Sequence, residues 1–285
     1  MKHQTKTKIF KILSLLPNKI GDAVYHLLQR ADDINVDKKI KSTNSSYQQI
    51  RKILEDNKIS LNGKVIAEIG SGWVPILPYQ MVLDGKAREV HTFDINQHYD
   101  KKQIREVNLY FKNNYDDFTT VGTYDLLPNI NYFPKKNIVH ADLSEVDIII
   151  SRFVLEHVPP DLLAQMHQAF FEKLKPASII LHLISPSDHR AYSDNSISLQ
   201  DFLKYSEYEW NQIQTRFDYH NRMRLPHYLE MFSKHFEIVY FSHDQINPNS
   251  ESYKKFKELK LHHDYLDYSD QELMAGSIEV LLRKK

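Results

Sequence analysis

The chain has 285 residues, of which 41% are hydrophobic, enough for a packed core. Lys and Arg together number 37, as do Asp and Glu, so no overall charge attracts the chain to nucleic acid, and no such partner is expected. Cysteine is absent, which excludes disulfides, thiolate metal ligands and a cysteine nucleophile.

Residues 1–58 are predicted to form a helical extension. The first 21 residues carry five lysines and no acid, interleaved with apolar side chains, which is typical of a basic amphipathic helix. Such a helix either makes a weak contact with an anionic membrane face or covers the core or a cofactor, and the second is favoured. A signal peptide is not expected, because Lys11 interrupts the apolar stretch. No apolar run approaches the roughly 20 residues of a membrane-spanning helix. The absence of cysteine is compatible with a reducing compartment, and the cytoplasm is the expected location.

Residues 59–285 are predicted to form one α/β domain. The run 64–69 is rich in branched residues and bounded by glycine, as is typical of a strand buried on both faces. A helix is expected at 75–83, because proline suits a first helical turn. The alternation continues with strands at 89–94, 137–140, 146–151 and 178–184, and with helices at 99–113 and 161–174. The last of these helices is expected to pack on the sheet through Leu162, Leu163, Met166, Phe170 and Leu174.

The alternation stops after Ser185. Residues 185–225 are rich in Ser, Asp, Asn, Tyr and Trp, and are predicted to form an inserted cap on the acceptor side of the domain. A helix at 226–235, a strand at 236–241 and an antiparallel strand at 277–282 follow, whereas 250–270 reads as a solvated helix. The sequence therefore predicts a doubly wound, mostly parallel seven-stranded sheet.

Three features predict a nucleoside site at the carboxyl ends of the strands. Gly70-Ser71-Gly72 directly follows the first strand, where absent side chains let the backbone approach a ligand, and Glu68 can accept from an ammonium or a bridging water. Asp94 ends the second strand, 24 residues after Gly70, where a carboxylate can accept from both hydroxyls of a ribose.

The third feature is Asp142, which can accept from an adenine amino group, with Leu143 against the ring. Ile95, Ser151 and Arg152 complete the predicted cofactor contacts. A dinucleotide fingerprint requires a third glycine where this chain has Pro75, which disfavours a pyrophosphate site.

These residues carry a resemblance to a known family. Residues 65–72 resemble the first motif of class I methyltransferases, and residues 147–158 resemble the fourth. Leu174-Lys175-Pro176-Ala177 matches the usual turn before strand five, with Ala177 where glycine is customary. The resemblance covers about 45–245 and implies a Rossmann-like fold, S-adenosylmethionine as cofactor, and methyl transfer.

Four further stretches, at 72–75, 187–189, 202–206 and 221–224, resemble a branch of bacterial methyltransferases associated with cell-surface glycan or secondary-metabolite synthesis. This resemblance implies a small-molecule or glycan acceptor. One departure is Val74, which stands where the family has its third glycine and narrows the space expected near the methionine part of the cofactor.

Methyl transfer from a sulfonium is an in-line displacement, and a hydroxyl acceptor requires a base. The candidates are His189, which is either a base oriented by Asp188 or a residue that organises the loop, and His157, which follows strand four and whose counterpart in the family often only shapes the cofactor pocket. A metal site of Asp188, His189 and His182 is conceivable but disfavoured, so no metal is expected.

Several residues of the insertion carry two interpretations. The aromatic side chains either suit a sugar or planar acceptor or form the insertion's own small core; they are Tyr192, Tyr205, Tyr208, Trp210 and Tyr219. Arg222 and Arg224 either hold an acidic group of the acceptor or form surface ion pairs.

The hypothesis is therefore methylation of a small molecule or glycan, at oxygen. The alternatives are an NAD-dependent oxidoreductase or epimerase on a related fold, and a non-catalytic cofactor-binding scaffold, which Val74 keeps open. The sequence indicates no oligomeric state.

Overall fold

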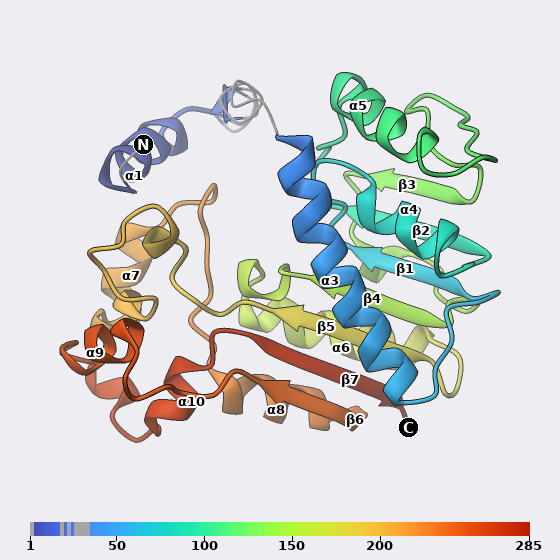
Figure 1. The fold of residues 1–285 in the computed structure, drawn as a ribbon. Coiled ribbons are helices and arrows are strands. Elements are labelled where there is room, and N and C mark those ends of the chain that lie inside the picture. The colour runs from blue at the N-terminus through green and yellow to red at the C-terminus, as the bar shows by residue number, and fades with distance from the viewer. Residues whose placement is uncertain (1–2, 18–19, 22–23, 26–34) are drawn as a thin grey trace.

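A computed structural model describes residues 3–17, 20–21, 24–25 and 35–285 (Figure 1). It contains a seven-stranded sheet in the order β3-β2-β1-β4-β5-β7-β6. The strands are β1 (Val65–Ile69), β2 (Glu89–Asp94), β3 (Ile130–Pro134), β4 (Ile148–Arg152), β5 (Ile179–Ile184), β6 (Phe236–His243) and β7 (Ile278–Lys284). Within the described ranges, no helix is both long enough and apolar enough to cross a membrane.

The sheet is parallel except for β7, which pairs antiparallel with both β5 and β6. The predicted mostly parallel, seven-stranded sheet is thus confirmed, as is the antiparallel direction of the last strand. That strand lies inside the sheet, and β6 forms the edge.

The expected third strand at 137–140 is wrong. Residues Ile138–His140 form a 3-10 turn, η1, whereas β3 lies earlier and pairs with β2 from Val90↔Ile130 to Asp94↔Pro134. A strand that ends in proline suits this sheet edge, because one side of its backbone needs no partner strand.

Helices cover both faces of the sheet. One face carries α3 (Val36–Asp56), α4 (Ile76–Leu83) and α5 (Lys101–Lys112), and the other carries α6 (Pro160–Lys173) and α8 (Leu225–Ser233). Asn35 and Asp100 begin α3 and α5 by accepting from free backbone N–H groups of the first turn. In α6 the predicted apolar face is buried except for Leu162, which is exposed.

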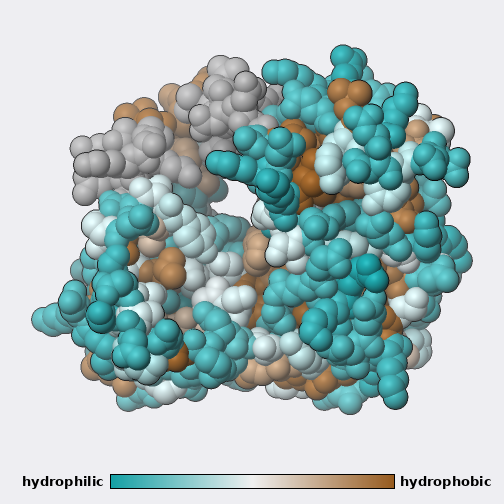
Figure 2. Space-filling model, in the orientation of Figure 1, coloured by the Kyte–Doolittle hydropathy of each residue, from teal (hydrophilic) through white to brown (hydrophobic). Residues whose placement is uncertain are grey.

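The cap lies at the end of the sheet to which the parallel strands point (Figure 1). It contains α7 (Glu207–Ile213), α9 (Glu251–Lys257), α10 (Asp270–Met274) and three 3-10 turns, which are η3 (His189–Tyr192), η4 (Asp201–Lys204) and η5 (His263–Tyr265). Figure 2 shows a largely hydrophilic face that is hollowed between the cap and the sheet.

Two distant segments build this cap around a small core of their own, which consists of Phe202, Leu203, Trp210, Phe256, Tyr265 and Leu273. The expectation of one solvated helix at 250–270 is therefore wrong. The α-helix there covers only 251–257, the short 3-10 turn η5 follows at 263–265, and Phe256 is buried. The apolar side chains of this segment are interspersed with charged ones and do not define one helix face. Their burial depends instead on contact with the residues around Trp210.

The N-terminal helix α1 (His3–Ser14) packs against the cap through aromatic contacts. The ring of Phe10 lies 5.5 Å from that of Tyr25 and 6.1 Å from that of Phe217, and Phe10 and Leu13 are buried. These contacts fit the covering role expected for this helix. Lys2 and Lys19 of the basic stretch lie outside the described residues.

Candidate functional site

The loop after β1 brings bare backbone to the carboxyl edge of the sheet. Gly70 has φ +81°, and a Cβ there would lie 2.5 Å from Cγ2 of Val154, so both conformation and space require glycine. Gly72 has φ +60°, with open space around its missing side chain. The loop is therefore shaped for close approach of a ligand to its backbone.

Asp94 lies against this loop. Its carboxylate accepts a hydrogen bond from the Ser71 hydroxyl at 3.2 Å and one from the backbone N–H of Asn96 at 2.8 Å. The N–H of Gly70 donates to the carbonyl of Phe93 at 2.8 Å, which joins the loop to the end of β2. The predicted glycine loop and the predicted ribose-binding acid are thus neighbours at one edge of the sheet.

Glu68 lies beneath the loop with its carboxylate almost fully buried. It accepts a hydrogen bond from the Thr92 hydroxyl at 2.5 Å. Burial raises the pKa of Glu68 to about 8, against the opposing effects of that hydrogen bond and of Arg152. A cationic group placed nearby would favour the charged carboxylate.

Arg152 leaves the end of β4 toward α3. Its Nε donates to the Ser46 hydroxyl at 2.7 Å, and Nη2 donates to the Ser42 hydroxyl at 2.9 Å. Burial lowers the pKa of Arg152, while Glu68 and Glu156 act in the opposite direction. The guanidinium thus lies within the electrostatic reach of two buried carboxylates.

Ser151 points to the opposite face of the sheet, under α6. Its hydroxyl contacts Nδ1 of His182 at 2.7 Å, and Nε2 of His182 contacts Nε2 of His167 at 3.1 Å. All three residues are fully buried. Only the backbone of Ser151 is therefore left to face a cofactor.

The remaining predicted cofactor contacts differ in accessibility. Ile95 is 72% exposed beside Asp94, which is unusual for an isoleucine and leaves an apolar surface open to a ligand. Asp142 is exposed and accepts from the backbone N–H of Ser144 at 3.0 Å, a hydrogen bond that lowers its pKa. Leu143 is fully buried, so a contact of this segment with an adenine ring would come from its backbone. Val74 is buried in the core beneath α4.

A cluster of histidines lies where β4 and β5 end. The ring centroids of His157 and His189 are 4.9 Å apart, and His220 lies 5.3 Å from His157 and 4.6 Å from His189. Nδ1 of His157 contacts the carbonyl of Tyr219 at 3.0 Å. Burial lowers the pKa of His157, which favours the neutral imidazole. The two predicted catalytic histidines are therefore brought together.

Glu156 adjoins this cluster, in the 3-10 turn η2 (Leu155–His157). It is fully buried, and neither carboxylate oxygen has a hydrogen-bond partner among the described residues. Burial raises its pKa to about 8. Sequence reasoning missed both Glu156 and His220, because 64 residues separate them and only the fold unites them.

Asp188, the expected orienting partner of His189, binds Arg190. Its carboxylate is held by Arg190, with a shortest contact of 2.6 Å, and Arg190 also binds Asp201. An arginine two residues away offers several N–H donors in one plane, and it takes both carboxylate oxygens of Asp188. The conceivable metal site of Asp188, His189 and His182 is excluded, because both ring nitrogens of His182 already make hydrogen bonds, one with Ser151 and one with His167.

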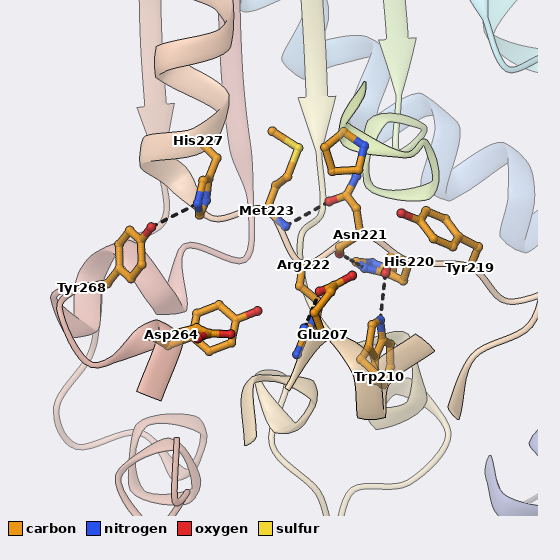
Figure 3. A pocket seen from close by; sticks show the side chains of 12 residues that line it. Glu207, Trp210, Tyr219, His220, Asn221, Arg222, Met223, His227, Asp264 and Tyr268 are labelled. Carbon is orange, nitrogen blue, oxygen red and sulfur yellow. Dashed lines mark hydrogen bonds and ion pairs between the residues drawn. The ribbon is translucent and has the colours of Figure 1, made fainter. Parts of the chain in front are cut away.

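The cap contains a cavity of about 320 Å³ beside the histidine cluster (Figure 3). His220 and Tyr219 form the wall nearest the cluster, and Glu207, Asp264 and Tyr268 come from other parts of the cap. Polar and aromatic groups together line the space, as suits a polar ligand with flat faces.

Both arginines considered as acceptor anchors are buried and bonded to neighbouring protein groups. Arg224 is fully buried and donates to three backbone carbonyls, at Pro186, Arg222 and Leu273. Arg222 donates to the carbonyls of Phe202 and Tyr205 and pairs with Glu207 at 2.5 Å. A surface ion pair therefore does not describe Arg224, which has no open surface for an acceptor, whereas Arg222 pairs with the exposed Glu207 and lines the cavity.

The aromatic residues of the insertion divide between the two interpretations. Trp210 belongs to the core of the cap and lines the cavity, and its ring N–H donates to the carbonyl of His220 at 3.1 Å. Tyr219 lines the cavity, whereas Tyr192 and Tyr208 are exposed and Tyr205 packs on the cap core.

Neither a protein-family model nor a curated protein sequence matches the chain. Among solved structures, it is similar to a protein from Galdieria sulphuraria described as a sarcosine dimethylglycine methyltransferase, with 13% identity, a TM-score of 0.52, and coverage of 85% of this chain and 86% of that one.

Two further similar structures have lower scores. Magnesium protoporphyrin IX methyltransferase from Synechocystis PCC 6803, with bound S-adenosylhomocysteine, has a TM-score of 0.49 at 11% identity over 88% of each chain. A protein from Listeria monocytogenes described as an S-adenosylmethionine-dependent methyltransferase has a TM-score of 0.48 at 13% identity, over 86% of this chain and 98% of that one. The strand order and the likeness to the Galdieria structure show that this chain has the Rossmann-like fold of class I S-adenosylmethionine-dependent methyltransferases.

Proposed function

We propose that the chain is a cytoplasmic enzyme that binds S-adenosylmethionine and transfers its methyl group to an oxygen of a small molecule or glycan. The observation that carries this proposal is the contact of Ser71 with Asp94, which unites the glycine loop and the strand-terminal acid at the point where the strand order diverges.

The residues at this edge fit the chemistry of the cofactor. The open backbone at Gly72 leaves room for the amino-acid part, and Asp94 is placed to accept from ribose hydroxyls. The buried Glu68 supplies a carboxylate that an ammonium would draw into its charged form. Ile95 offers an exposed apolar surface to the base.

The cap cavity supports the acceptor half of the proposal. His220 belongs both to the cavity wall and to the histidine cluster, so an acceptor held in the cavity lies close to His157 and His189. The mixture of tyrosine, tryptophan and acidic side chains suits a sugar or another hydroxylated molecule.

The cofactor supplies an electrophilic methyl group on a sulfonium, and this chain must align an acceptor and manage one proton. His157 donates Nδ1–H to the carbonyl of Tyr219, which leaves Nε2 with its lone pair. That nitrogen, or the ring of His189 beside it, is suited to accept the hydroxyl proton as the acceptor oxygen attacks.

The exposed side of the basic N-terminal segment supports a second proposal, a weak contact with a membrane surface. Ile12 and Leu15 of the N-terminal segment are exposed beside Lys11, a combination that suits an anionic membrane face. Phe10 and Leu13, on the other side, are buried against the cap. A weak peripheral contact therefore remains compatible with the covering role.

The NAD-dependent alternative is less well supported. Pro75 occupies the position of the third fingerprint glycine and caps the N-terminus of α4, where it offers no N–H to a pyrophosphate. Only the absence of methyl transfer would distinguish a non-catalytic, cofactor-binding scaffold from an enzyme.

Calorimetry with S-adenosylmethionine, S-adenosylhomocysteine and NAD tests the cofactor assignment, and release of S-adenosylhomocysteine across a panel of hydroxylated acceptors tests turnover. We expect binding of the two sulfur nucleosides and turnover with a hydroxylated acceptor. Binding of NAD alone would reverse the assignment, and binding without turnover on any acceptor would favour the scaffold.

A further inference from the structure

The group formed by Glu156, His157 and His189 has the dimensions of a metal site. One potential ligand atom from each of these residues lies within 4.8 Å of the others. Bonds of about 2.0–2.2 Å to one ion place its ligand atoms roughly 3–4.4 Å apart, so movements below about 1 Å would close the set.

We propose that Glu156, His157 and His189 bind one divalent transition-metal ion at the acceptor side of the cap. As ligands of the ion, His157 and His189 would not act as the base; the ion would instead lower the pKa of an acceptor hydroxyl that it holds, so that water can take the proton. That role rests on the proposed function, whereas binding of the ion does not require the cofactor. This inference replaces the sequence-based expectation that no metal is bound.

The first supporting observation is the state of Glu156. Its carboxylate is fully buried; the backbone N–H groups of Glu156 and Ser185 lie close enough to lower its pKa, but neither oxygen has a partner in hydrogen-bond geometry among the described residues. Such burial disfavours the charged form, and a cation bound nearby would stabilise it. Arg152 interacts with it electrostatically but gives its hydrogen bonds to Ser42 and Ser46.

The second observation is the orientation of the imidazoles. His157 directs Nδ1–H at the carbonyl of Tyr219, which leaves Nε2 free to act as a ligand. His220 makes the same kind of contact with the carbonyl of Asn221 at 2.6 Å, and its Nε2 has no hydrogen-bond partner in the described structure. Histidines that bind metals characteristically donate their second ring N–H in this way, which fixes the tautomer.

The donor set indicates the kind of ion. Two imidazoles and one carboxylate, without thiolate, suit Zn²⁺, Mn²⁺, Fe²⁺ or Co²⁺ better than Ca²⁺ or Mg²⁺. Three protein ligands leave coordination positions open, as in catalytic zinc sites. His157 is desolvated on one side yet partly open to solvent, and His189 is half-buried, so an acceptor can reach this side of the group from solvent.

Titration of the chelator-treated protein with Zn²⁺, and with Co²⁺ followed by its visible absorption, tests the proposal. We expect one tight equivalent per chain and a Co²⁺ spectrum typical of nitrogen and oxygen ligands. His189→Gln and Glu156→Gln should each weaken binding more than about 100-fold, since loss of a mere outer-shell partner costs roughly 10–100-fold. Thermal melts establish that each variant is folded.

The chain offers a matched control in His262, His263 and Asp264, whose potential ligand atoms also lie within 4.8 Å of one another, on a more exposed surface. His263→Gln should leave the tight equivalent unchanged. Absence of tight binding in the unaltered protein, or its loss in His263→Gln with retention in His189→Gln, would overturn the proposal. Calorimetry with S-adenosylhomocysteine on the same samples separates this outcome from failure of the proposed function.

Discussion

The Ser71 hydroxyl donates a hydrogen bond to the Asp94 carboxylate across 3.2 Å, and this contact joins the loop after β1 to the end of β2. The two residues are 23 positions apart in the chain and come together because β1 and β2 are parallel neighbours in register from Val65↔Glu89 to Ile69↔Phe93. Both carboxyl ends therefore meet at one point, where a nucleoside can contact both.

Replacing Asp94 with alanine should weaken binding of S-adenosylhomocysteine by about 1–3 kcal/mol, because the ribose hydroxyls lose a charged acceptor. Calorimetry measures this change. Asp116→Ala, at an exposed aspartate in the loop after α5, is the matched control and should bind normally. Equal affinity of the Asp94 variant and the unaltered protein would remove Asp94 from the site.

Affinity for S-adenosylhomocysteine should rise with pH between about 6 and 8. Burial raises the pKa of Glu68 to about 8, so in the free protein this carboxyl group is largely protonated below that pH. An ammonium favours the charged form, and binding below pH 8 therefore requires loss of a proton. Well below pH 8, the affinity for S-adenosylhomocysteine should rise by about tenfold per pH unit. Glu68→Gln should flatten the profile, and a Gln variant with an unchanged slope would assign the pH dependence to another group.

Folding stability should fall as the pH drops from about 6.5 to 4 because of His167. Burial lowers its pKa from 6.5 to about 4, so the unfolded chain binds a proton in this range and the folded protein does not. The free energy of unfolding should lose about 3 kcal/mol through this group. Urea denaturation of His167→Gln should show a smaller loss across this range, whereas His140→Gln, at an exposed histidine, should behave like the unaltered protein.

The hydrogen bonds of His167 and His182 identify which ring nitrogen of each neutral imidazole carries the proton. His167 donates Nδ1–H to the carbonyl of Leu163 at 2.8 Å, so its Nε2 accepts from Nε2–H of His182. Nδ1 of His182 then accepts from the Ser151 hydroxyl. Protonation of either ring would break this chain, because an imidazolium has no acceptor nitrogen.

Ala177→Gly should stabilise the protein by about 0.5–1 kcal/mol. Ala177 has φ +63° in the exposed turn before β5, a conformation that costs a residue with a side chain roughly 1–2 kcal/mol. Glycine avoids that cost but loses part of the gain through the greater freedom of its unfolded chain. Thermal and urea unfolding measure the difference, and a less stable glycine variant would contradict the assignment of strain to this residue.

The sequence predicted the parts of the fold that have a local pattern. β1, β4 and β5 are short, mostly apolar runs bounded by turns, β2 mixes apolar and polar residues before its terminal acid, and the glycine loop follows directly from its residues. β3 was misplaced because Ile130–Pro134 is an edge strand of mostly half-buried residues, and its pairing with β2 determines its conformation.

Fewer of the contacts on the acceptor side could be predicted from the sequence. Asp188 precedes His189 directly, yet the carboxylate turns to Arg190, a choice that neighbouring positions alone could not reveal. The histidine cluster joins residues 157, 189 and 220, and the cap core joins Trp210 to Phe256. Such contacts between distant segments depend on the complete fold.

A crystal structure of the protein with S-adenosylhomocysteine would show directly where the adenosyl group binds. Our expectation is that both ribose hydroxyls lie within hydrogen-bond distance of the Asp94 carboxylate, with the amino-acid part against the backbone of Gly70 and Gly72. An adenosyl group bound in the cap cavity, or anywhere else away from these residues, would contradict it.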